Sequence, residues 1–401
     1  MIFPYLFSPI NDRVHHGGSM ESIPLAKPLI GKEEEEEVLD TLRSGLIGTG
    51  VKTEKFEQEF AAYQERKHGI GTNSCTAALH LSLSAFGIGA GDEVITTPIT
   101  FVATVSSIMY TGATPVFADV QPDTLNIDPA RIEEAITERT RAIIPVHLYG
   151  YPCDMDRIMD LAGKYNLKVI SDCAHAIETE YRGKKVGSYG DTACYSFYAT
   201  KNLAVGNGGM LVTDNDEITR VIQSTRDHGM ATGAWTRYNT GEFQEYPMIY
   251  KGYKYIMWDI PASLGLQQLR KIEQRHKKRV EIARQYYELL QPLSDFVDVI
   301  PPGEHIRHAH HMFVVKLKGV DRNKVAAEME NAGIGIGVHF RPVHLEPFHR
   351  QQYGHSPGEF PVAEDAGARV LSLPFWPEIT GEEVLRVVET LGKAIEKNRT
   401  A

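Results

Sequence analysis

Cysteine is scarce in this 401-residue sequence, and its cysteines form no motif. Cys75, Cys153, Cys173 and Cys194 stand singly, whereas zinc sites and redox dithiols use pairs such as C-x-x-C. The same scatter argues against a disulfide framework and against an iron–sulfur cluster. These four residues predict reduced, buried thiols in a cytoplasmic protein without a bound metal.

Basic residues are outnumbered, because 42 Lys and Arg face 52 Asp and Glu, for a formal net charge of -10. Binding to nucleic-acid phosphates requires a basic surface, so nucleic acid is not expected as a partner. One anionic small molecule is still compatible with this charge, since a local pocket can carry the opposite sign.

Membrane-spanning apolar runs are also missing. Residues 94–118 carry no charge, but six threonines and Pro98, Gly112 and Pro115 interrupt the run. This favours a strand, a helix and a strand in a protein interior, and no membrane partner is expected. Residues 1–19 lack the basic start and cleavage site of a secretory signal and are interpreted as a flexible leader.

The length of the chain and the order of its patterns predict two domains. From residue 69, strand-like and helix-like segments alternate, which indicates an α/β fold with a mainly parallel sheet between helices and ligands at the carboxyl ends of the strands. The predicted strands are 93–97, 115–119, 142–146 and 168–171, and the predicted helices are 32–42, 51–64, 76–86, 101–110, 129–138 and 154–165. The glutamates Glu33 to Glu37 on the first helix are interpreted as a solvated face.

After Lys254 the pattern changes to that of a smaller α+β domain. A long charged helix is predicted at 263–290, followed by a strand at 312–317, a helix at 322–332, a strand at 335–340 and a closing helix at 381–397. We therefore expect a leader of residues 1–19, a large domain of residues 20–255, and a long helix with a small C-terminal domain over residues 256–401.

Lys201 and Asp172 indicate the chemistry of this chain. Lys201 lies in the mostly uncharged run Ser196-Phe197-Tyr198-Ala199-Thr200-Lys201-Asn202-Leu203. Burial lowers the pKa of a lysine and frees its amine to form a Schiff base. Asp172 ends a predicted strand, where a carboxylate can pair with a pyridinium nitrogen. Together the two residues predict pyridoxal 5'-phosphate (PLP) as cofactor, although a buried structural lysine is the alternative for Lys201 alone.

A phosphate site is predicted where Gly71-Thr72-Asn73-Ser74-Cys75-Thr76 runs into a helix. Free N–H groups and the helix dipole favour an anion there, and Ser74 and Thr76 add hydroxyls, although simple N-capping explains the same residues. Ser196, five residues before Lys201, is a further phosphate donor. The glycine motifs of nucleotide-binding folds are incomplete in this chain.

Several other residues allow two interpretations each. His175 is either a cofactor contact or an interior histidine, and Phe101 either stacks on a flat ring or belongs to the core. His339 and His344 flank Phe340-Arg341-Pro342, a loop that could reach the active cleft, with Arg341 as the candidate for an anionic substrate group. His308, His310 and His311 lack the further ligands of a metal site and are interpreted as surface or interface histidines.

These segments, in chain order, resemble the DegT/StrS family of PLP-dependent sugar aminotransferases. The resemblance extends from Ile23 to the C-terminal helix and leaves out about the first 20 residues. The blocks that carry it are Ser74-Cys75-Thr76-Ala77-Ala78-Leu79-His80-Leu81, Asp172-Cys173-Ala174-His175-Ala176, Gly187-Ser188-Tyr189-Gly190-Asp191, Tyr195 to Leu203, and Leu371-Ser372-Leu373-Pro374-Phe375.

The resemblance implies a fold-type I aminotransferase, usually a homodimer whose active sites lie at the subunit interface. Lys201 would form the Schiff base with PLP, and Asp172 would pair with the pyridine nitrogen. The remaining cofactor contacts implied are His175 at the phenolic oxygen, Phe101 on the ring, Ser196 with Ser74, Cys75 and Thr76 at the phosphate, and Lys254 at the partner's phosphate.

The implied reaction moves an amino group from L-glutamate to a keto group of a nucleotide-linked sugar, for polysaccharide or lipopolysaccharide biosynthesis. The segments 252–257 and 337–341 resemble the branch that aminates C4 of a 4-keto-6-deoxy sugar. Asn207 replaces the family's usual acid, and Ile256 stands where Asn or Arg is common, which leaves the donor or sugar contact open. The alternatives are a PLP-dependent sugar dehydratase and a non-catalytic regulatory relative; the presence of Lys201 argues against both.

Overall fold

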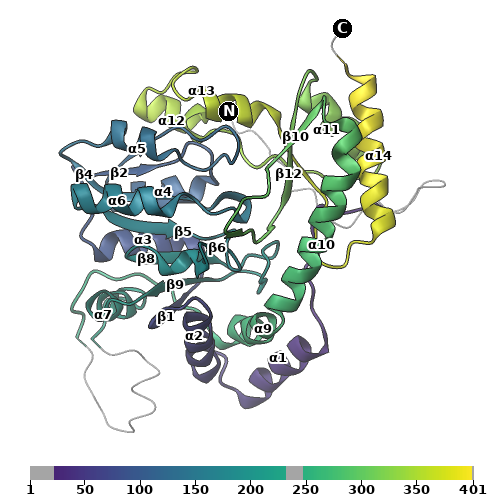
Figure 1. The fold of residues 1–401 in the computed structure, drawn as a ribbon. Helices are drawn as coiled ribbons and strands as arrows, with labels where there is room; N and C mark the ends of the chain where they lie inside the picture. The colour runs from purple at the N-terminus through teal and green to yellow at the C-terminus, as the bar shows by residue number, and fades with distance from the viewer. Residues whose placement is uncertain (1–21, 232–246, 400–401) are drawn as a thin grey trace, which may run out of the picture.

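A seven-stranded sheet forms the centre of the computed structural model, which describes residues 22–231 and 247–399 (Figure 1). The strand order is β1-β9-β8-β5-β4-β2-β3. Neighbours from β3 to β8 are parallel, whereas β9 is antiparallel to both β8 and β1, so the prediction of a mainly parallel sheet is confirmed. The strands are β1 (His68–Thr72), β2 (Glu93–Thr96), β3 (Thr114–Phe117), β4 (Thr140–Ile144), β5 (Lys168–Asp172), β8 (Thr192–Ser196) and β9 (Gly209–Thr213). The predicted leader, residues 1–19, lies outside the described residues.

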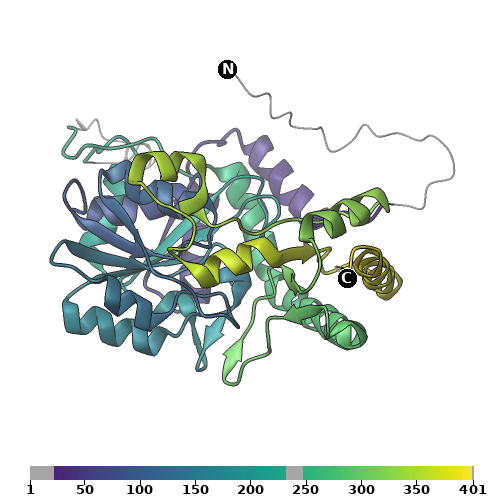
Figure 2. The same cartoon turned by 90° about the horizontal axis from the view of Figure 1, so that it is seen from above.

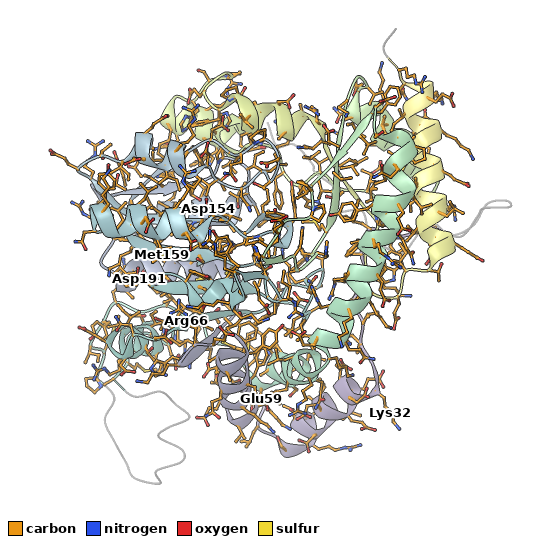
Figure 3. The ribbon with its side chains drawn as sticks, in the orientation of Figure 1. Lys32, Glu59, Arg66, Asp154, Met159 and Asp191 are labelled. Carbon is orange, nitrogen blue, oxygen red and sulfur yellow. The ribbon has the colours of Figure 1, made fainter. Side chains whose placement is uncertain are left out.

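Helices cover both faces of this sheet. Alternate strand residues point to opposite sides, so each face presents apolar side chains to its own set of helices. Val169, Ala193 and Val212 face one set of helices, and Ile170 and Cys194 face the other. The first set is α2 (Val51–Tyr63), α5 (Pro129–Ala135), α6 (Met155–Tyr165) and α9 (Asp259–Arg270); the second is α3 (Cys75–Ala85), α4 (Val102–Thr111) and α7 (Asp216–Thr225). In Figure 3, the labels of Asp154 and Met159 indicate where α6 lies on the first face of the sheet.

Helix α1 (Lys32–Ser44) departs from its predicted role as a fully solvated glutamate face. Glu34 is buried, and its carboxylate accepts hydrogen bonds from Lys271 Nζ at 2.7 Å and from Gly31 N at 3.0 Å. Burial opposes ionisation of Glu34, but these hydrogen bonds outweigh it and lower its pKa. The interpretation was therefore wrong for Glu34, which ties α1 to Lys271, the residue directly before helix α10 (Ile272–Leu290).

The C-terminal part contains its own antiparallel sheet in the order β10-β12-β13. Its strands are β10 (Val297–Val299), β12 (Phe313–Leu317) and β13 (Val370–Leu373), and its helices are α10 (Ile272–Leu290), α11 (Arg322–Asn331), α12 (Pro347–Tyr353), α13 (Pro361–Arg369) and α14 (Gly381–Lys397). Tyr286, Phe313 and Leu391 belong to a separate hydrophobic core, which also includes Ile23 from the start of the described chain. Seen from above (Figure 2), α10 and α14 lie to one side of the large sheet.

Two predicted C-terminal elements were wrong. The helix predicted at 263–290 is two helices, because α9 ends at Arg270 and α10 begins at Ile272. The strand predicted at 335–340 forms no ladder: Gly335 N bonds to Ile23 O, and Gly337 makes an isolated bridge to Ser372. The third strand of the small sheet is β13 instead.

A further three-stranded sheet, β11-β6-β7, joins the two parts of the chain. Its strands are β6 (Glu180–Tyr181), β7 (Lys184–Lys185) and β11 (Ile306–Arg307). None of the helices in residues 22–231 and 247–399 is both long and apolar enough to cross a membrane. All four cysteines are buried, as predicted.

Candidate active site

The carboxyl ends of β5 and β8 bring the predicted catalytic residues to one edge of the large sheet. Asp172 is the last residue of β5, Ser196 is the last of β8, and the parallel register pairs Asp172 with Cys194. Gly209 begins β9 opposite Ser196 and also opposite Thr72, the last residue of β1. The start of α3 therefore follows at the same edge, as expected for a ligand site in a parallel sheet.

Lys201 lies in the loop that connects β8 to β9. The buried side chains of Phe197, Leu203 and Val205 anchor this loop in the core, and Lys201 N donates to Tyr198 O at 2.9 Å. Burial lowers the pKa of the Lys201 amine to about 8, against the opposing influence of Asp172 and Cys75. A substantial fraction of this amine is thus neutral and nucleophilic near neutral pH.

Asp172 is a buried carboxylate held by two donors. Ala174 N donates to Oδ1 at 3.0 Å, and Thr104 Oγ1 of α4 donates to Oδ2 at 2.8 Å. Burial raises the pKa of Asp172, while the two donors and Lys201 act in the opposite direction. A cationic ring nitrogen at this position would restore the balance in favour of the carboxylate.

His175 follows Asp172 by three residues and is buried. Tyr149 N donates to its Nδ1 at 3.1 Å, so the neutral imidazole carries its proton on Nε2. Burial, followed by the charge of Lys201, holds the pKa of His175 well below its usual value, which keeps the ring neutral. His175 can therefore donate one hydrogen bond from Nε2.

The predicted phosphate residues lie at the N-terminus of α3. Ser74 caps the helix, and its Oγ accepts from Ala77 N at 3.1 Å, which confirms the capping interpretation for this hydroxyl. The N–H groups of Cys75 and Thr76 belong to the first turn, which has no helical acceptors. A Cβ placed on Gly209 would lie 2.6 Å from Cys75 N, so β9 and α3 approach each other as closely as a glycine permits.

The other four residues predicted for the site lie in different surroundings. Phe101 is the N-cap of α4, three residues before Thr104, and its side chain is 60% exposed. The electrostatic influence of Lys201 reaches His339, whose Nδ1 lies 2.8 Å from Ser372 Oγ. Arg341 and Lys254 are not brought to Lys201: Arg341 pairs with Glu346 at 3.5 Å, and Lys254 pairs with Asp227 at 2.8 Å.

His311 is an active-site residue that the sequence interpretation missed. It is buried rather than at a surface, and its Nε2 lies 3.4 Å from Lys201 Nζ. Its ring packs against that of His175, with centroids 4.5 Å apart. The short spacing in His308-Ala309-His310-His311 suggested a metal cluster or surface histidines. His311 gains its role from Lys201, which is 110 positions away in the sequence but adjacent in space.

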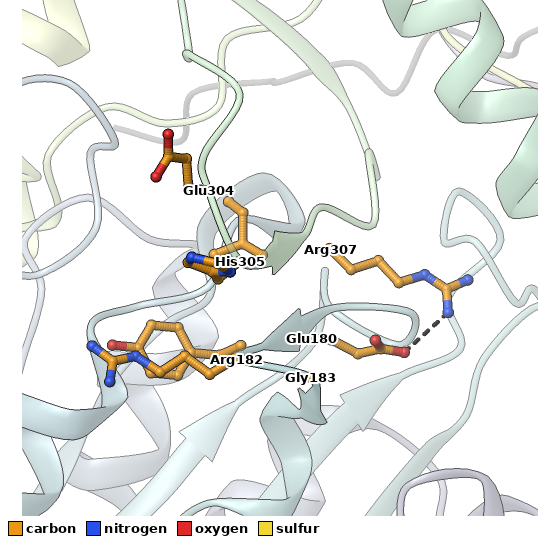
Figure 4. Close-up of a pocket in the computed structure, with 8 residues that line it drawn as sticks. Glu180, Arg182, Gly183, Glu304, His305 and Arg307 are labelled. Atoms are coloured by element: carbon orange, nitrogen blue, oxygen red, sulfur yellow. Dashed lines mark hydrogen bonds and ion pairs between the residues drawn. The ribbon is translucent and has the colours of Figure 1, made fainter.

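An open groove lies away from these residues (Figure 4). It has a volume of about 950 Å³ and lies between the β6–β7 hairpin and β11. Its arginines are already paired, Arg182 with Asp156 and Arg307 with Glu180. Within residues 22–231 and 247–399, no cluster of His, Cys, Asp and Glu is arranged to hold a metal ion.

The donors and acceptors at the sheet edge fit PLP. A buried carboxylate at Asp172 suits a protonated pyridine nitrogen, Nε2–H of His175 suits a phenolic oxygen, and the first turn of α3 suits a phosphate. The neutral fraction of the Lys201 amine suits an aldehyde. These groups surround a single edge of the sheet, which is the arrangement that one cofactor requires.

Known proteins resemble this chain over nearly its whole length. The spore coat polysaccharide biosynthesis protein SpsC of Bacillus subtilis is 46% identical over 376 residues, covering 92% of this chain and 96% of SpsC. The PLP form of the putative sugar aminotransferase Spr1654 from Streptococcus pneumoniae is 32% identical with a TM-score of 0.87, covering 94% of this chain and 100% of that one. PseC of Helicobacter pylori, an aminotransferase involved in the biosynthesis of pseudoaminic acid, is 28% identical with a TM-score of 0.88, covering 94% and 100%.

The family match agrees with the site and the fold. Residues 28–392 match the DegT/DnrJ/EryC1/StrS aminotransferase family, and this range contains every residue placed at the sheet edge above. Because this match extends over most of the chain, the chain belongs to the DegT/DnrJ/EryC1/StrS aminotransferase family.

Proposed function

We propose that this protein is a PLP-dependent sugar aminotransferase that transfers the amino group of L-glutamate to a keto group, at C4, of a nucleotide-linked 4-keto-6-deoxy sugar. The observation that carries the proposal is the position of the Lys201 amine at the carboxyl edge of the sheet, 3.4 Å from His311 Nε2, where Asp172 ends β5. The names of SpsC, Spr1654 and PseC support a sugar as the class of acceptor.

PLP, when bound, supplies an electron-accepting ring that stabilises negative charge at the amino-bearing carbon of the substrate. Lys201 would hold the cofactor's aldehyde, and its Nζ would move a proton to and from that carbon. Asp172 would keep the pyridine nitrogen protonated, and Nε2–H of His175 would donate to the phenolic oxygen. Phe101 would cover the ring with its exposed aromatic side chain.

The phosphate is assigned to the first turn of α3 together with Ser74 and Ser196. Ser196 ends β8 directly opposite Gly209, whose missing Cβ allows β9 to approach Ser74 and Cys75 closely. His339 and Arg341 are assigned to the substrate. Ile256 pairs with Thr72 at the end of β1, so an apolar residue lies near this phosphate site where a polar one would offer a contact.

The proposal includes a homodimer that completes the site. Phe101, Tyr198 and Trp258 are large side chains left exposed in the described part of the chain, and Tyr198 lies three residues before Lys201. Large exposed apolar side chains are typical of an interface. Lys254, which lies on the surface beside Asp227, is available to the partner's phosphate.

Two further assignments complete the proposal. A cytoplasmic location is supported by four buried and unpaired cysteines, which fit a reducing compartment. For the domain division we favour a boundary at Lys271 over the one predicted at 255/256, because α9 packs in the core of the large sheet and α10 in the C-terminal core.

Borohydride reduction of the purified protein tests the chemistry. Reduction should abolish the visible absorbance of the bound cofactor and fix it to the peptide that contains Lys201, as mass spectrometry would reveal. Lys201→Ala should lose both signals, whereas Lys164→Ala, which removes an exposed lysine paired with Glu133, should keep them. Label on any other lysine would refute the assignment.

The acceptor is tested with a panel of nucleotide-linked 3-keto and 4-keto sugars, with glutamate as donor and mass spectrometry as readout. Amination of a 4-keto-6-deoxy sugar is expected. Selective amination of 3-keto sugars would overturn the C4 assignment and leave the cofactor chemistry intact.

A further inference from the structure

A buried chain of hydrogen bonds leads away from Lys201 and plays no part in the reaction described above. It begins where Lys201 Nζ meets His311 Nε2 at 3.4 Å and continues from His311 Nδ1 to Asn202 Oδ1 at 3.2 Å. Asn202 Nδ2 then contacts both carboxylate oxygens of Glu178, at 3.1 and 3.0 Å. Arg279 of α10 ends the chain, 3.3 Å from the same carboxylate.

The direction of every hydrogen bond in this chain follows from its buried end. Glu178 is fully buried and forms an ion pair with Arg279 at 3.3 Å, and a carboxylate in an ion pair only accepts. The amide nitrogen of Asn202 must therefore face Glu178, where it also donates to Ala309 O at 3.1 Å. This orientation turns the amide oxygen of Asn202 toward His311.

The orientation of Asn202 fixes the tautomer of His311. Because Asn202 Oδ1 accepts, Nδ1 of His311 carries the proton and Nε2 keeps its lone pair. Tyr149 O accepts from the backbone N–H of His311 at 3.1 Å and holds its segment in place. The ring therefore presents an acceptor, and not a donor, to the lysine amine.

We propose that His311 is a positioning residue for Lys201, whose Nζ–H it accepts at Nε2, and that Glu178 and Asn202 set His311 in the tautomer that this requires. The inference rests on the proposed role of Lys201. Without a hydrogen-bond acceptor, the Lys201 amine would have no fixed orientation, because burial removes water that would otherwise solvate it.

The charged and titratable groups around the Lys201 amine make its pKa sensitive to the hydrogen-bond acceptor at His311 Nε2. Those with an electrostatic influence on Lys201, or influenced by it, come from four different segments: Cys75, Asp172, His175, His311 and His339. A hydrogen-bond acceptor stabilises an ammonium more than it stabilises an amine. Loss of the acceptor should therefore lower the pKa of Lys201 further and free the amine to turn away.

His311→Gln and His311→Met form a matched pair for the test. Both side chains have the same length and both lose the donor at Nδ1, but only glutamine places an oxygen at the position of Nε2. The measurement is trace acetylation of the full-length protein without cofactor, across a range of pH, with the Lys201 peptide quantified by mass spectrometry. Thermal melting of both variants reports whether they fold alike.

His311→Gln should retain the midpoint of the wild-type profile. His311→Met should increase the acid dissociation constant of Lys201 about threefold or more, since a charge-assisted hydrogen bond is lost. Equal profiles for His311→Met and wild type would overturn the inference, and so would equal shifts in both variants, because the acceptor would then have no role.

The tautomer offers a test on the wild-type protein itself, in which a variant serves only to assign the signal. Nitrogen NMR of histidine-labelled wild-type protein should reveal His311 with a protonated Nδ1 and an unprotonated Nε2, the signal being assigned by its absence from His311→Gln. A proton on Nε2 would overturn the inference. If borohydride fixes the cofactor to a lysine other than Lys201, the proposed function fails first; correct labelling with unchanged profiles defeats this inference alone.

Discussion

At the scale of single residues, Thr104 is expected to set the affinity for the cofactor through Asp172. Its hydroxyl donates to Asp172 Oδ2 at 2.8 Å and also lies 2.7 Å from Thr100 Oγ1. Thr104→Val removes this donor, raises the pKa of a carboxylate that burial already raises, and should weaken PLP binding about 5- to 30-fold, or roughly 1–2 kcal/mol.

Thr104→Ser is the matched control, because it keeps the hydroxyl and loses only a methyl group. Dissociation constants for PLP, measured by fluorescence titration of the protein without cofactor, should separate the two variants. Equal constants for Thr104→Val and Thr104→Ser would mean that the hydroxyl does not support Asp172.

The pKa of Lys201 predicts how fast the protein captures its cofactor. With a pKa of about 8, the neutral fraction of the amine rises about tenfold between pH 7 and pH 9 and then levels off. An unperturbed lysine would give a rise of about 100-fold over the same range without levelling. Stopped-flow absorbance of PLP binding across this range should reveal the plateau, and a continued rise beyond pH 9 would contradict it.

The residues at the sheet edge differ in how far sequence can identify them. Lys201 and Asp172 were recognisable because their residue types and apolar neighbours point to one chemistry. Thr104 and His311 were not, since each gains its role from a partner 68 or 110 positions away. A histidine among other histidines carries no sign, in sequence, of whether it faces water or a lysine.

At the scale of secondary-structure elements, the contact between β9 and the start of α3 defines the phosphate site. Gly209→Ala would place a Cβ 2.6 Å from Cys75 N and push the first turn of α3 away from Ser196. We expect weaker PLP binding by about tenfold or more, and destabilisation by about 1–3 kcal/mol.

Gly163→Ala in α6 is the control, because a Cβ there meets no atom within 4 Å. It should leave cofactor binding unchanged and stabilise its helix by up to about 1 kcal/mol. PLP titration and chemical denaturation of both variants measure the two effects. Unchanged binding in Gly209→Ala would place the phosphate elsewhere.

The boundaries of an element were predictable where its capping residues and the apolar period of its sequence indicate the same end. Thr380 caps α14 with Glu383 in a capping box, and the predicted range of this helix is the observed one. The break at Lys271 was not predictable, because one non-helical residue hardly disturbs the apolar period of the helices on either side. At this break the Lys271 side chain binds Glu33 and Glu34 of α1, a tertiary contact that the sequence does not indicate.

Apolar alternation misled the prediction for residues 335–340 in another way. Ile334, Ile336 and Val338 alternate as in a strand, but their backbone is shared between two partners that lie far apart in the chain. Ile334 bridges to Ile23, and Gly337 bridges to Ser372. A sequence pattern records which side chains are buried, but it does not record whether one neighbour or two provide the backbone partners.

At the scale of the whole molecule, an apolar patch predicts where two copies meet. Leu46, Ile47 and Val51 lie in or next to the loop after α1 and are 53%, 53% and 54% exposed. Hydrogen bonds from Asp259 N to Gly48 O and from Thr49 Oγ1 to Met257 O hold this loop beside Trp258, which is 45% exposed. The four side chains form one surface at the entry to α9, which packs on the large sheet.

Ile47→Glu should therefore convert the proposed dimer to a monomer, because burying a carboxylate in an apolar interface without a partner is costly. The variant should also lose PLP-dependent activity while keeping its fold, since the proposed site draws Lys254 from the other copy. Sedimentation velocity measures the first effect and circular dichroism checks the fold. Leu385→Glu on α14, at a side chain that is 43% exposed outside this patch, should remain a dimer. A dimeric Ile47→Glu protein would move the interface to another surface and remove the reason for assigning Lys254 to the partner's phosphate.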